Sequence, residues 1–265
     1  MQTGKRQKSL VIVNAFGLVG ALVMNALANA LPLNGKNTGE ISDAIPDLFA
    51  PAGMTFAIWG VIYLLLVLLV VYQGFLAGRQ SPRAFLIERM GPWFSISSAG
   101  NALWIVAWHW ERQLLSFLLI LLILLSLIML YLRVNRVESA LSPSIALRLP
   151  VSIYLGWITV AAIANLTTVL VVYEWNRFGL SEVFWTAIMI GSAVIINLLV
   201  LIREKDIGFA LVGLWALFGI YMKRAADAQI IPEVINAAAA GMALLAVGIA
   251  VRGVMSFKEK FTVAK

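Results

Sequence analysis

The chain contains no cysteine and only one histidine, His109. The lack of cysteine excludes disulfides, iron–sulfur clusters and thiolate zinc sites, and a single histidine excludes a multi-histidine metal centre. Charged residues are also scarce, at 12% of 265 residues, whereas 62% of the residues are hydrophobic. Soluble domains are about one-quarter charged and about half apolar, so this chain has too little polar surface to cover a water-soluble globule. We therefore expect an integral membrane protein with several transmembrane segments.

Eight segments are long and apolar enough to cross a bilayer as helices, a crossing that takes about 20 residues. They are Leu10–Leu33, Met54–Ala77, Pro92–Trp110, Leu114–Leu132, Leu149–Tyr173, Val183–Ile202, Ile207–Met222 and Val234–Val251. The alternation of apolar and polar residues that a membrane β-barrel requires is missing. The sequence therefore predicts an all-α fold, a polytopic transmembrane helix bundle with eight spans.

The basic residues are distributed unevenly between the two sides of the membrane that these spans define. Of the 20 Lys and Arg residues, all lie on one side except Lys36, Arg112, Arg177, Lys223 and Arg224. The positive-inside rule then places both termini in the cytoplasm, in agreement with an even number of spans. We expect the cell (plasma) membrane as the location and the first apolar segment as an uncleaved anchor, because at about 24 residues it is longer than the apolar part of a signal peptide. The net charge of +7 follows from this topology, so we expect the lipid bilayer and no nucleic acid as a partner.

The segment Asn34–Ala50, between the first two spans, contains Glu40, Asp43 and Asp47 against one lysine. Two interpretations are open. The segment is either a solvated linker, or a lid over a pocket that opens on that side of the membrane, since loops of this length are often functional.

No Asp, Glu, Lys or Arg lies near the centre of any predicted span. Pumps, proton-coupled carriers and voltage sensors usually carry such residues at membrane depth, so this absence argues against those classes. No Ser–His–acid set can be assembled, and we expect the protein not to be an enzyme. His109 lies beside Trp108 and Trp110 at a predicted membrane edge, where it is either part of an interfacial aromatic belt or an axial ligand for a porphyrin iron.

Three of the nine tryptophans lie inside predicted spans rather than at their edges: Trp59, Trp104 and Trp157. Indole rings from three helices either form a flat apolar slot for a planar aromatic ligand or fill core volume, and composition leaves both interpretations open. Asn101 and Asn165 lie in two of the same spans, where amides most often bond neighbouring helices.

Motifs in three spans point to a known family. The second span carries Pro51, Gly53, Phe56, Trp59 and Tyr63 in that order; the third carries Asn101-Ala-Leu-Trp104; and the fifth carries Tyr154-Leu-Gly-Trp157 followed by Ala161 and Asn165. Together these motifs resemble those of the tryptophan-rich sensory protein family, also called the translocator protein or peripheral benzodiazepine receptor family. The resemblance covers residues 8–177.

The resemblance implies a five-helix bundle in residues 1–177, with a pocket beneath the first long loop, and a three-helix C-terminal transmembrane extension in residues 178–265. Members of the family bind porphyrins, sterols and related flat molecules in that pocket. Carried over by position, the ligand-binding residues are Trp59, Asn101, Trp104, Trp157, Ala161 and Asn165. We expect no required cofactor and no metal, and the resemblance makes a porphyrin or related tetrapyrrole the candidate ligand.

The sequence thus predicts an integral membrane ligand-binding or sensory protein for a small, flat, apolar molecule. The alternative is a membrane transporter for a neutral or amphipathic small solute, because eight spans suit a carrier better than a receptor. A homodimer is a candidate assembly, since faces rich in glycine and alanine support helix association in membranes.

Overall fold

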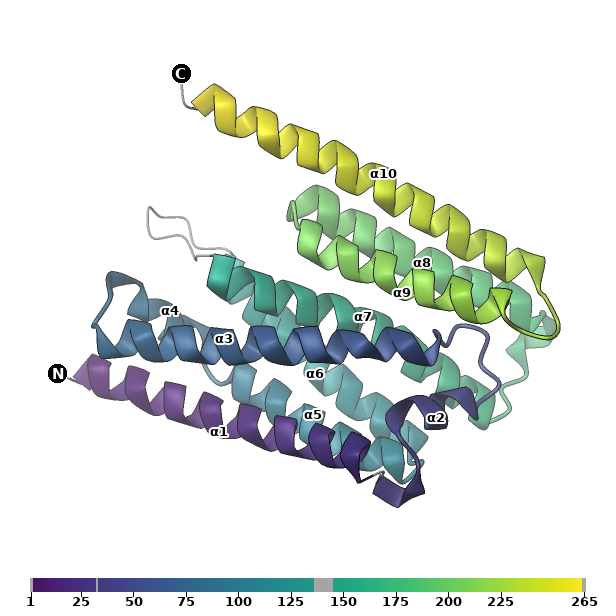
Figure 1. The fold of residues 1–265 in the computed structure, drawn as a ribbon, viewed down its shortest axis with the longest axis horizontal. Helices are drawn as coiled ribbons and strands as arrows, with labels where there is room; N and C mark the ends of the chain where they lie inside the picture. Colours follow the sequence, from purple (N-terminus) through teal and green to yellow (C-terminus); the bar gives the residue numbers. More distant parts are fainter. Residues whose placement is uncertain (1, 32, 136–144, 264–265) are drawn as a thin grey trace. The chain divides into compact units, whose positions relative to one another are not determined.

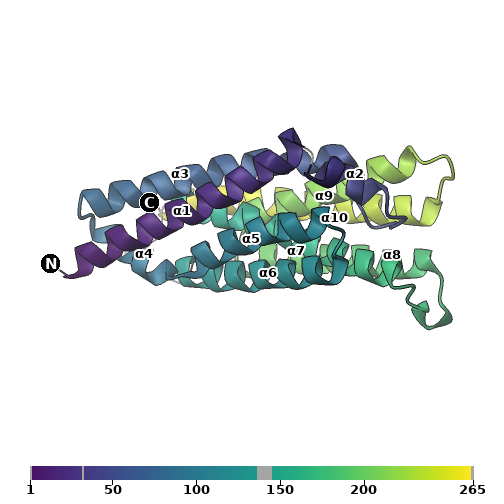
Figure 2. The same cartoon turned by 90° about the horizontal axis from the view of Figure 1, so that it is seen from below.

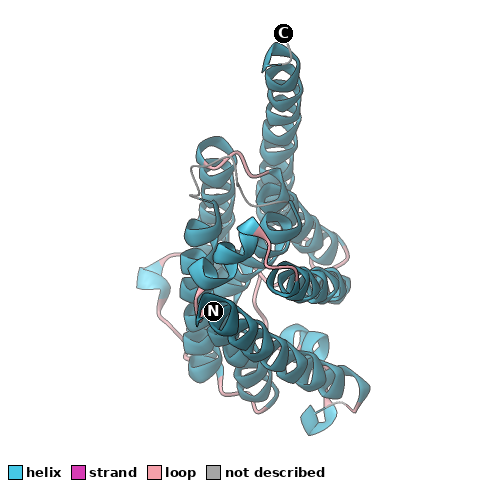
Figure 3. Ribbon diagram, turned by 90° about the vertical axis from the view of Figure 1, so that its left-hand side faces the viewer, coloured by secondary structure: helices cyan, strands magenta, loops and turns pink. Residues whose placement is uncertain are grey.

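The computed structural model describes residues 2–31, 33–135 and 145–263. Within these residues the secondary structure consists of helices joined by turns and loops, without β-strands (Figure 3). The predicted all-α fold class is therefore confirmed. Arg136 and Lys265, two of the basic residues behind the topology prediction, lie outside the described residues.

Seven helices in the described part of the chain are long and apolar enough to cross a membrane. They are Gly4–Ala30, Gly53–Gly78, Gln113–Asn135, Ile145–Val172, Glu182–Arg203, Ile207–Ala225 and Pro232–Glu259. They coincide with seven of the eight predicted spans and make the chain a multi-pass membrane protein. The remaining predicted span, Pro92–Trp110, corresponds to helix α5, Trp93–His109, whose 17 residues fall short of the about 20 that a crossing usually takes. The count of eight spans therefore stays a prediction.

The chain forms two compact units, and it passes from one to the other inside two short helices, Thr38–Asp43 and Gly53–Ala57, and inside one long helix. The first unit comprises Met1–Ile41 and Ala57–Ile158, and the second comprises Ser42–Phe56 and Thr159–Lys265. Helix α7, Ile145–Val172, contributes its first half to the first unit and its second half to the second unit. The predicted domains 1–177 and 178–265 follow a different division of the chain and stay a prediction.

The first unit is a helical bundle (Figures 1 and 2). It contains α1 (Gln2–Ala30), α3 (Ile58–Gly78), α4 (Phe85–Met90), α5, α6 (Gln113–Asn135) and the first half of α7. Helix α5 packs against both α1 and α6, and α1 also packs against α3. The approach of α5 to α6 is close because Gly100 faces Ile123, where a Cβ on the glycine would lie 2.9 Å from the Cγ1 atom of Ile123.

Buried polar side chains also join the helices of this unit. The Nδ2 group of Asn14 on α1 donates a hydrogen bond of 2.9 Å to the Oε1 atom of Gln73 on α3. The Ser95 hydroxyl on α5 donates a bond of 2.7 Å to the Oδ1 atom of Asn14. In an apolar bundle these bonds fix the rotation of α1, α3 and α5 about their axes, so they determine which side chains face inward.

The second unit contains the second half of α7, α8 (Glu182–Arg203), α9 (Ile207–Ala225), α10 (Pro232–Val263) and the segment 42–56. Each of α8, α9 and α10 packs against the other two (Figure 1). Side-chain caps set two of the helix starts: Ser181 accepts a hydrogen bond from the Phe184 amide at 3.1 Å, and Asp206 accepts one from the Phe209 amide at 3.0 Å. Gly213 of α9 lies directly against the side chain of Asn197 on α8, so any Cβ there would overlap the amide.

Short helical turns lie in the connections. They are η1 (Leu33–Gly35), α2 (Thr38–Asp43), η2 (Gly53–Ala57), η3 (Pro82–Ala84) and η4 (Arg177–Gly179).

Candidate functional site

Three helices of the first unit each contribute one tryptophan to a common cluster. The rings of Trp59 on α3 and Trp104 on α5 are stacked, with centroids 6.0 Å apart and an interplanar angle of 30°. The ring of Trp157 on α7 meets Trp59 edge-on, at 6.3 Å and 84°. These distances lie in the range of about 4.5–7 Å in which aromatic pairs attract each other. The structure therefore brings together the three indoles that the sequence singled out.

Two tyrosines complete the group. The ring of Tyr63 stacks on Trp59 at 5.2 Å, and the ring of Tyr154 meets Trp59 edge-on at 5.9 Å. Sequence reasoning placed both tyrosines in motifs but not among the site residues. The spacing was the available signal, because Tyr63 follows Trp59 by one helical turn and Tyr154 precedes Trp157 by almost one turn. We call Trp59, Tyr63, Trp104, Tyr154 and Trp157 the aromatic cluster.

The indoles of the aromatic cluster face the inside of the bundle. Trp59 is 9% exposed, and Trp104 and Trp157 are each 3% exposed. The ring of Trp59 contacts the rings of Trp104 and Trp157 directly. The indoles therefore fill core volume in this structure, and a slot for a planar ligand stays a prediction.

An asparagine at the edge of the cluster carries hydrogen-bonding capacity that the protein leaves unused. The Oδ1 atom of Asn101 on α5 accepts hydrogen bonds from Asn25 Nδ2 at 2.8 Å and from the Tyr63 hydroxyl at 3.3 Å. Its Nδ2 group is buried and makes no hydrogen bond within the described residues. A buried donor without an acceptor costs about 1–3 kcal/mol, so an acceptor supplied by a ligand would be favourable here.

The other two predicted site residues belong to the second unit. Ala161 and Asn165 follow Trp157 on α7 at steps of four residues, so they extend the face of the helix that carries the indole. The Asn165 Nδ2 group donates a hydrogen bond of 2.9 Å to the Ala161 carbonyl oxygen on its own helix. The first unit therefore holds four of the six predicted residues: Trp59, Asn101, Trp104 and Trp157.

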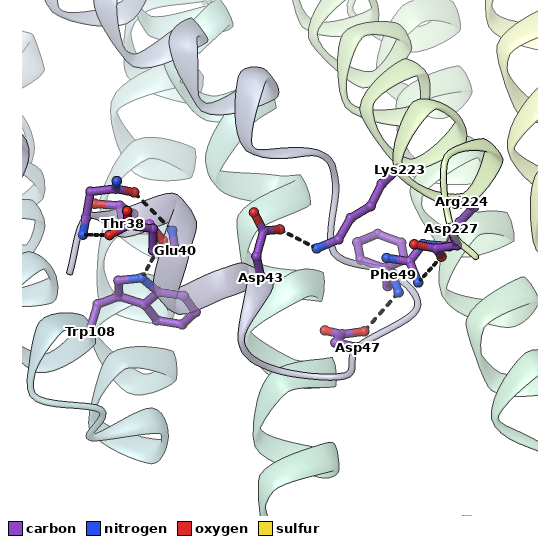
Figure 4. A network of polar contacts seen from close by, with 10 residues as sticks. Thr38, Glu40, Asp43, Asp47, Phe49, Trp108, Lys223, Arg224 and Asp227 are labelled. Atoms are coloured by element: carbon purple, nitrogen blue, oxygen red, sulfur yellow. Dashed lines mark hydrogen bonds and ion pairs between the residues drawn. The ribbon is translucent and has the colours of Figure 1, made fainter. Parts of the chain in front are cut away.

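The first half of the segment Asn34–Ala50 is fixed to the end of α5. Asn34 Nδ2 donates to the His109 carbonyl oxygen at 2.9 Å. Trp108 Nε1 donates to the Thr38 carbonyl oxygen at 3.2 Å (Figure 4). Lys36 pairs with Glu111 at 2.7 Å, an exposed contact that contributes little. The ring of Trp108 in turn stacks on the ring of Trp104, with centroids 6.0 Å apart. Trp108 therefore links this part of the segment to the aromatic cluster.

The second half of the segment is fixed within the second unit. The Asp43 carboxylate accepts a hydrogen bond of 2.6 Å from Lys223 Nζ on α9 (Figure 4). The Asp47 carboxylate accepts one from the Thr167 hydroxyl on α7 at 2.5 Å and one from the Phe49 amide at 2.9 Å. Phe49 is fully buried. The segment is therefore packed against helices in each unit, which contradicts the solvated-linker interpretation and leaves the lid interpretation as a prediction.

Burial raises the pKa of Asp47, because a charged carboxylate is poorly solvated there. The hydrogen bonds from Thr167 and the Phe49 amide oppose this rise, Glu182 adds to it through like charge, and Lys223 reduces it. The result is a carboxyl group whose pKa is raised from 3.8 in a segment that connects the two units in sequence.

His109 is fully buried rather than placed at an exposed membrane edge. Its Nδ1 atom lies 2.8 Å from the Ile105 carbonyl oxygen, so this nitrogen carries the proton, and Nε2 makes no hydrogen bond within the described residues. The described residues contain no group of three or more His, Asp or Glu side chains that could hold a metal ion. His109 is therefore a packing residue at the end of α5, and its backbone carbonyl oxygen anchors Asn34.

A family model described as "TSPO-like protein" matches residues 11–251 of the chain. The matched range contains every predicted site residue. It also runs past residue 177 and includes α8, α9 and much of α10, the helices that sequence reasoning treated as an addition to the family fold. No curated protein and no solved structure shows a significant match to the chain.

Proposed function

Because the chain belongs to the TSPO-like protein family, we propose that this multi-pass membrane protein is a sensor that binds a flat, largely apolar molecule, such as a porphyrin, at the aromatic cluster. The family membership confirms the resemblance found in the motifs of three spans. The family is generally non-enzymatic, and we extend this to the present chain, with no required cofactor.

The observation that carries the proposal is the convergence of Trp59, Trp104 and Trp157 from three helices onto one another. Each indole offers a broad apolar face, and planar guests gain by stacking on such faces. Small-molecule sites are usually apolar with a few placed polar groups that set orientation. The buried Asn101 amide provides one such group beside the rings.

Binding requires the stacked rings of Trp59 and Trp104 to separate so that the guest lies between them. The guest then replaces the ring-to-ring contact with two new stacking contacts, and it offers an acceptor, such as a carboxylate or carbonyl oxygen, to Asn101 Nδ2. The predicted affinity comes from stacking on the two indoles together with the hydrogen bond from Asn101.

We further propose that the first half of the Asn34–Ala50 segment is the lid of this site. Its anchors, Asn34 to the His109 carbonyl and Thr38 to Trp108, lie at the end of α5 beyond Trp104. Release of the bond to Thr38 frees the ring of Trp108 that stacks on Trp104. We further propose cytoplasmic termini, the plasma membrane as location and a homodimer as the assembly, with no nucleic-acid partner.

The test is an absorbance titration of purified protein with protoporphyrin. We expect Trp157→Phe to weaken binding by roughly fivefold through the lost indole contact, and Trp157→Ala by more than that. Trp185→Phe is the matched control, because Trp185 belongs to a separate aromatic group in the second unit with Trp175 at 4.9 Å. Unchanged affinity in Trp157→Ala, with folding verified by circular dichroism, would contradict the proposal.

Transport is the rival function, and a proteoliposome assay separates the two. A sensor retains porphyrin at a saturable site without accumulation in the lumen. Time-dependent accumulation that Trp157→Ala abolishes would identify a transporter that uses the same site.

A further inference from the structure

A pocket lies in the first unit, at the end of the bundle opposite the Asn34–Ala50 connection. It has a volume of about 370 Å³ and is formed by the start of α1 and the turn that follows α3. Five of the residues that line it are polar or basic: Lys5, Gln7 and Lys8 from α1, and Gln80 and Ser81 from the turn. Gly4, Ala77 and Ala84 complete the lining. This volume lies within the range of about 300–1,000 Å³ that is typical of small-molecule sites.

The charge around this pocket is positive and largely unpaired. Neither Lys5 nor Lys8 forms an ion pair within the described residues. Arg79 and Arg83 flank Gln80 and Ser81 in the turn. The nearby acid is Glu88, which accepts a hydrogen bond of 2.9 Å from Gln7 Nε2. Positive charges therefore outnumber negative ones at the pocket, and the polar lining of amide, hydroxyl and ammonium groups suits an oxygen-rich anion.

The pocket lies at the surface of the membrane because α1 and α3 are both membrane-crossing helices and meet there at their ends (Figure 1). The outer faces of the same two helices expose apolar side chains just below it, including Ile12 and Phe16 on α1 and Val71 and Phe75 on α3. An amphiphile with its anionic group in the pocket would extend its acyl chains over these side chains.

We propose that this pocket binds the phosphate group of an anionic phospholipid headgroup. Lys5 and Lys8 neutralise the phosphate, and Gln80 and Ser81 donate hydrogen bonds to its oxygens. Basic residues near a membrane surface contribute about 1 kcal/mol each to the attraction of anionic lipid. The pocket adds a defined geometry to this attraction, so its effect should exceed that of an equal charge elsewhere at the same end of the chain.

Native mass spectrometry of the full chain, with any tag at the C-terminus, measures the binding of phosphatidylglycerol and phosphatidylcholine. We expect the wild type to retain phosphatidylglycerol in preference to phosphatidylcholine. Loss of two basic residues at a membrane surface weakens the binding of anionic lipid by roughly twentyfold through charge alone. The double variant Lys5→Gln/Lys8→Gln should therefore lose more than roughly twentyfold in affinity for phosphatidylglycerol. The matched control is Arg6→Gln/Arg83→Gln, which removes the same charge from the same end without altering the pocket lining, and its loss should not exceed the charge effect.

A third variant tests the pocket without removing any lysine. Gly4 lines the pocket, and a Cβ at this position would meet nothing within 4 Å, so Gly4→Glu places a carboxylate there without steric conflict. We expect this variant to lose phosphatidylglycerol while its porphyrin affinity stays unchanged.

Equal losses in Lys5→Gln/Lys8→Gln and Arg6→Gln/Arg83→Gln would overturn the proposal, because they would show a general charge effect without a pocket. A second arm uses inorganic phosphate as the probe. If phosphate binds and depends on Lys5 and Lys8 while phosphatidylglycerol does not, the lipid assignment is wrong and the site serves a soluble phosphate compound. Absence of binding in both arms would overturn the site altogether.

Discussion

Two buried polar side chains, Asp47 and Asn101, differ in how completely the protein satisfies their hydrogen-bonding groups. Asp47 is 3% exposed, yet it keeps two hydrogen-bond donors, the Thr167 hydroxyl and the Phe49 amide. Asn101 is equally buried but has an amide group without an acceptor in the described residues. The first arrangement fits a structural anchor, and the second fits a position that a ligand completes.

The raised pKa of Asp47 predicts a specific dependence of stability on pH. Because the folded state holds this proton more tightly than the unfolded chain does, the stability that Asp47 contributes is complete below pH 3.8 and is lost as the pH rises through the raised pKa. We expect Asp47→Asn, which keeps an acceptor for the Phe49 amide, to show a smaller fall in melting temperature over that range. Thermal unfolding in detergent at a series of pH values measures this, and an identical fall in both proteins would contradict the assigned cause.

At the scale of elements, the segment 42–56 is held by α7 and α9 of the second unit. The Ala52 amide donates to the Gly219 carbonyl oxygen at 3.0 Å, and Trp215 Nε1 donates to the Thr55 carbonyl oxygen at 3.0 Å. The Thr55 side chain lies directly against Gly219. The segment therefore fits against α9 only because residue 219 has no side chain. The exposed Asp43 carboxylate contributes less to this attachment, since ion pairs at the surface are worth at most about 1 kcal/mol.

This attachment predicts the effect of adding one methyl group. In Gly219→Ala the new Cβ would overlap the Thr55 side chain, so the segment has to shift, at a cost of about 1–3 kcal/mol. Hydrogen–deuterium exchange should show lower protection of residues 42–56. The control Gly191→Ala, whose Cβ would meet nothing within 4 Å, should leave protection unchanged. Equal protection in wild type and Gly219→Ala would show that α9 does not hold the segment.

Sequence patterns predicted the elements better than their attachments. Hydropathy located seven long apolar helices, and the spacing of Trp59, Trp104 and Trp157 within three of the spans indicated residues that meet in the structure. The anchors of the Asn34–Ala50 segment were not predictable, because Asp47 and Thr167 are 120 residues apart in sequence and Asp43 and Lys223 are 180 apart. No local pattern records such pairs.

At the scale of the whole molecule, the count of membrane crossings depends on α5. Its first half contains Ser95, Ser97 and Ser98, which lower its hydropathy, but two of these serines are buried and bond the Phe94 carbonyl oxygen on their own helix. The hydroxyls of Ser97 and Ser98 are thus satisfied within the helix, which makes them compatible with the interior of a membrane. If α5 crosses the membrane, the chain crosses eight times and its two termini lie on the same side. If α5 does not cross, the termini lie on opposite sides.

The absence of cysteine allows a direct test of this count. We expect the single-cysteine variants Arg83→Cys and Arg112→Cys, which lie on either side of α4 and α5, to react with a membrane-impermeant maleimide from opposite sides of the membrane. The cysteine-free wild type is the background control. Labelling of both positions from the same side would show that α5 does not cross.

The central claim, that a planar ligand enters the aromatic cluster, is tested most directly by ¹⁹F NMR of protein labelled with 5-fluorotryptophan. Each resonance is assigned from the matching Trp→Phe variant. A porphyrin stacked within the cluster shifts nearby resonances through its ring current, so we predict large shifts for Trp59, Trp104 and Trp157 and none for Trp185, whose ring packs against Trp175 in a separate aromatic group. Porphyrin that binds while the three cluster resonances stay in place would contradict the account.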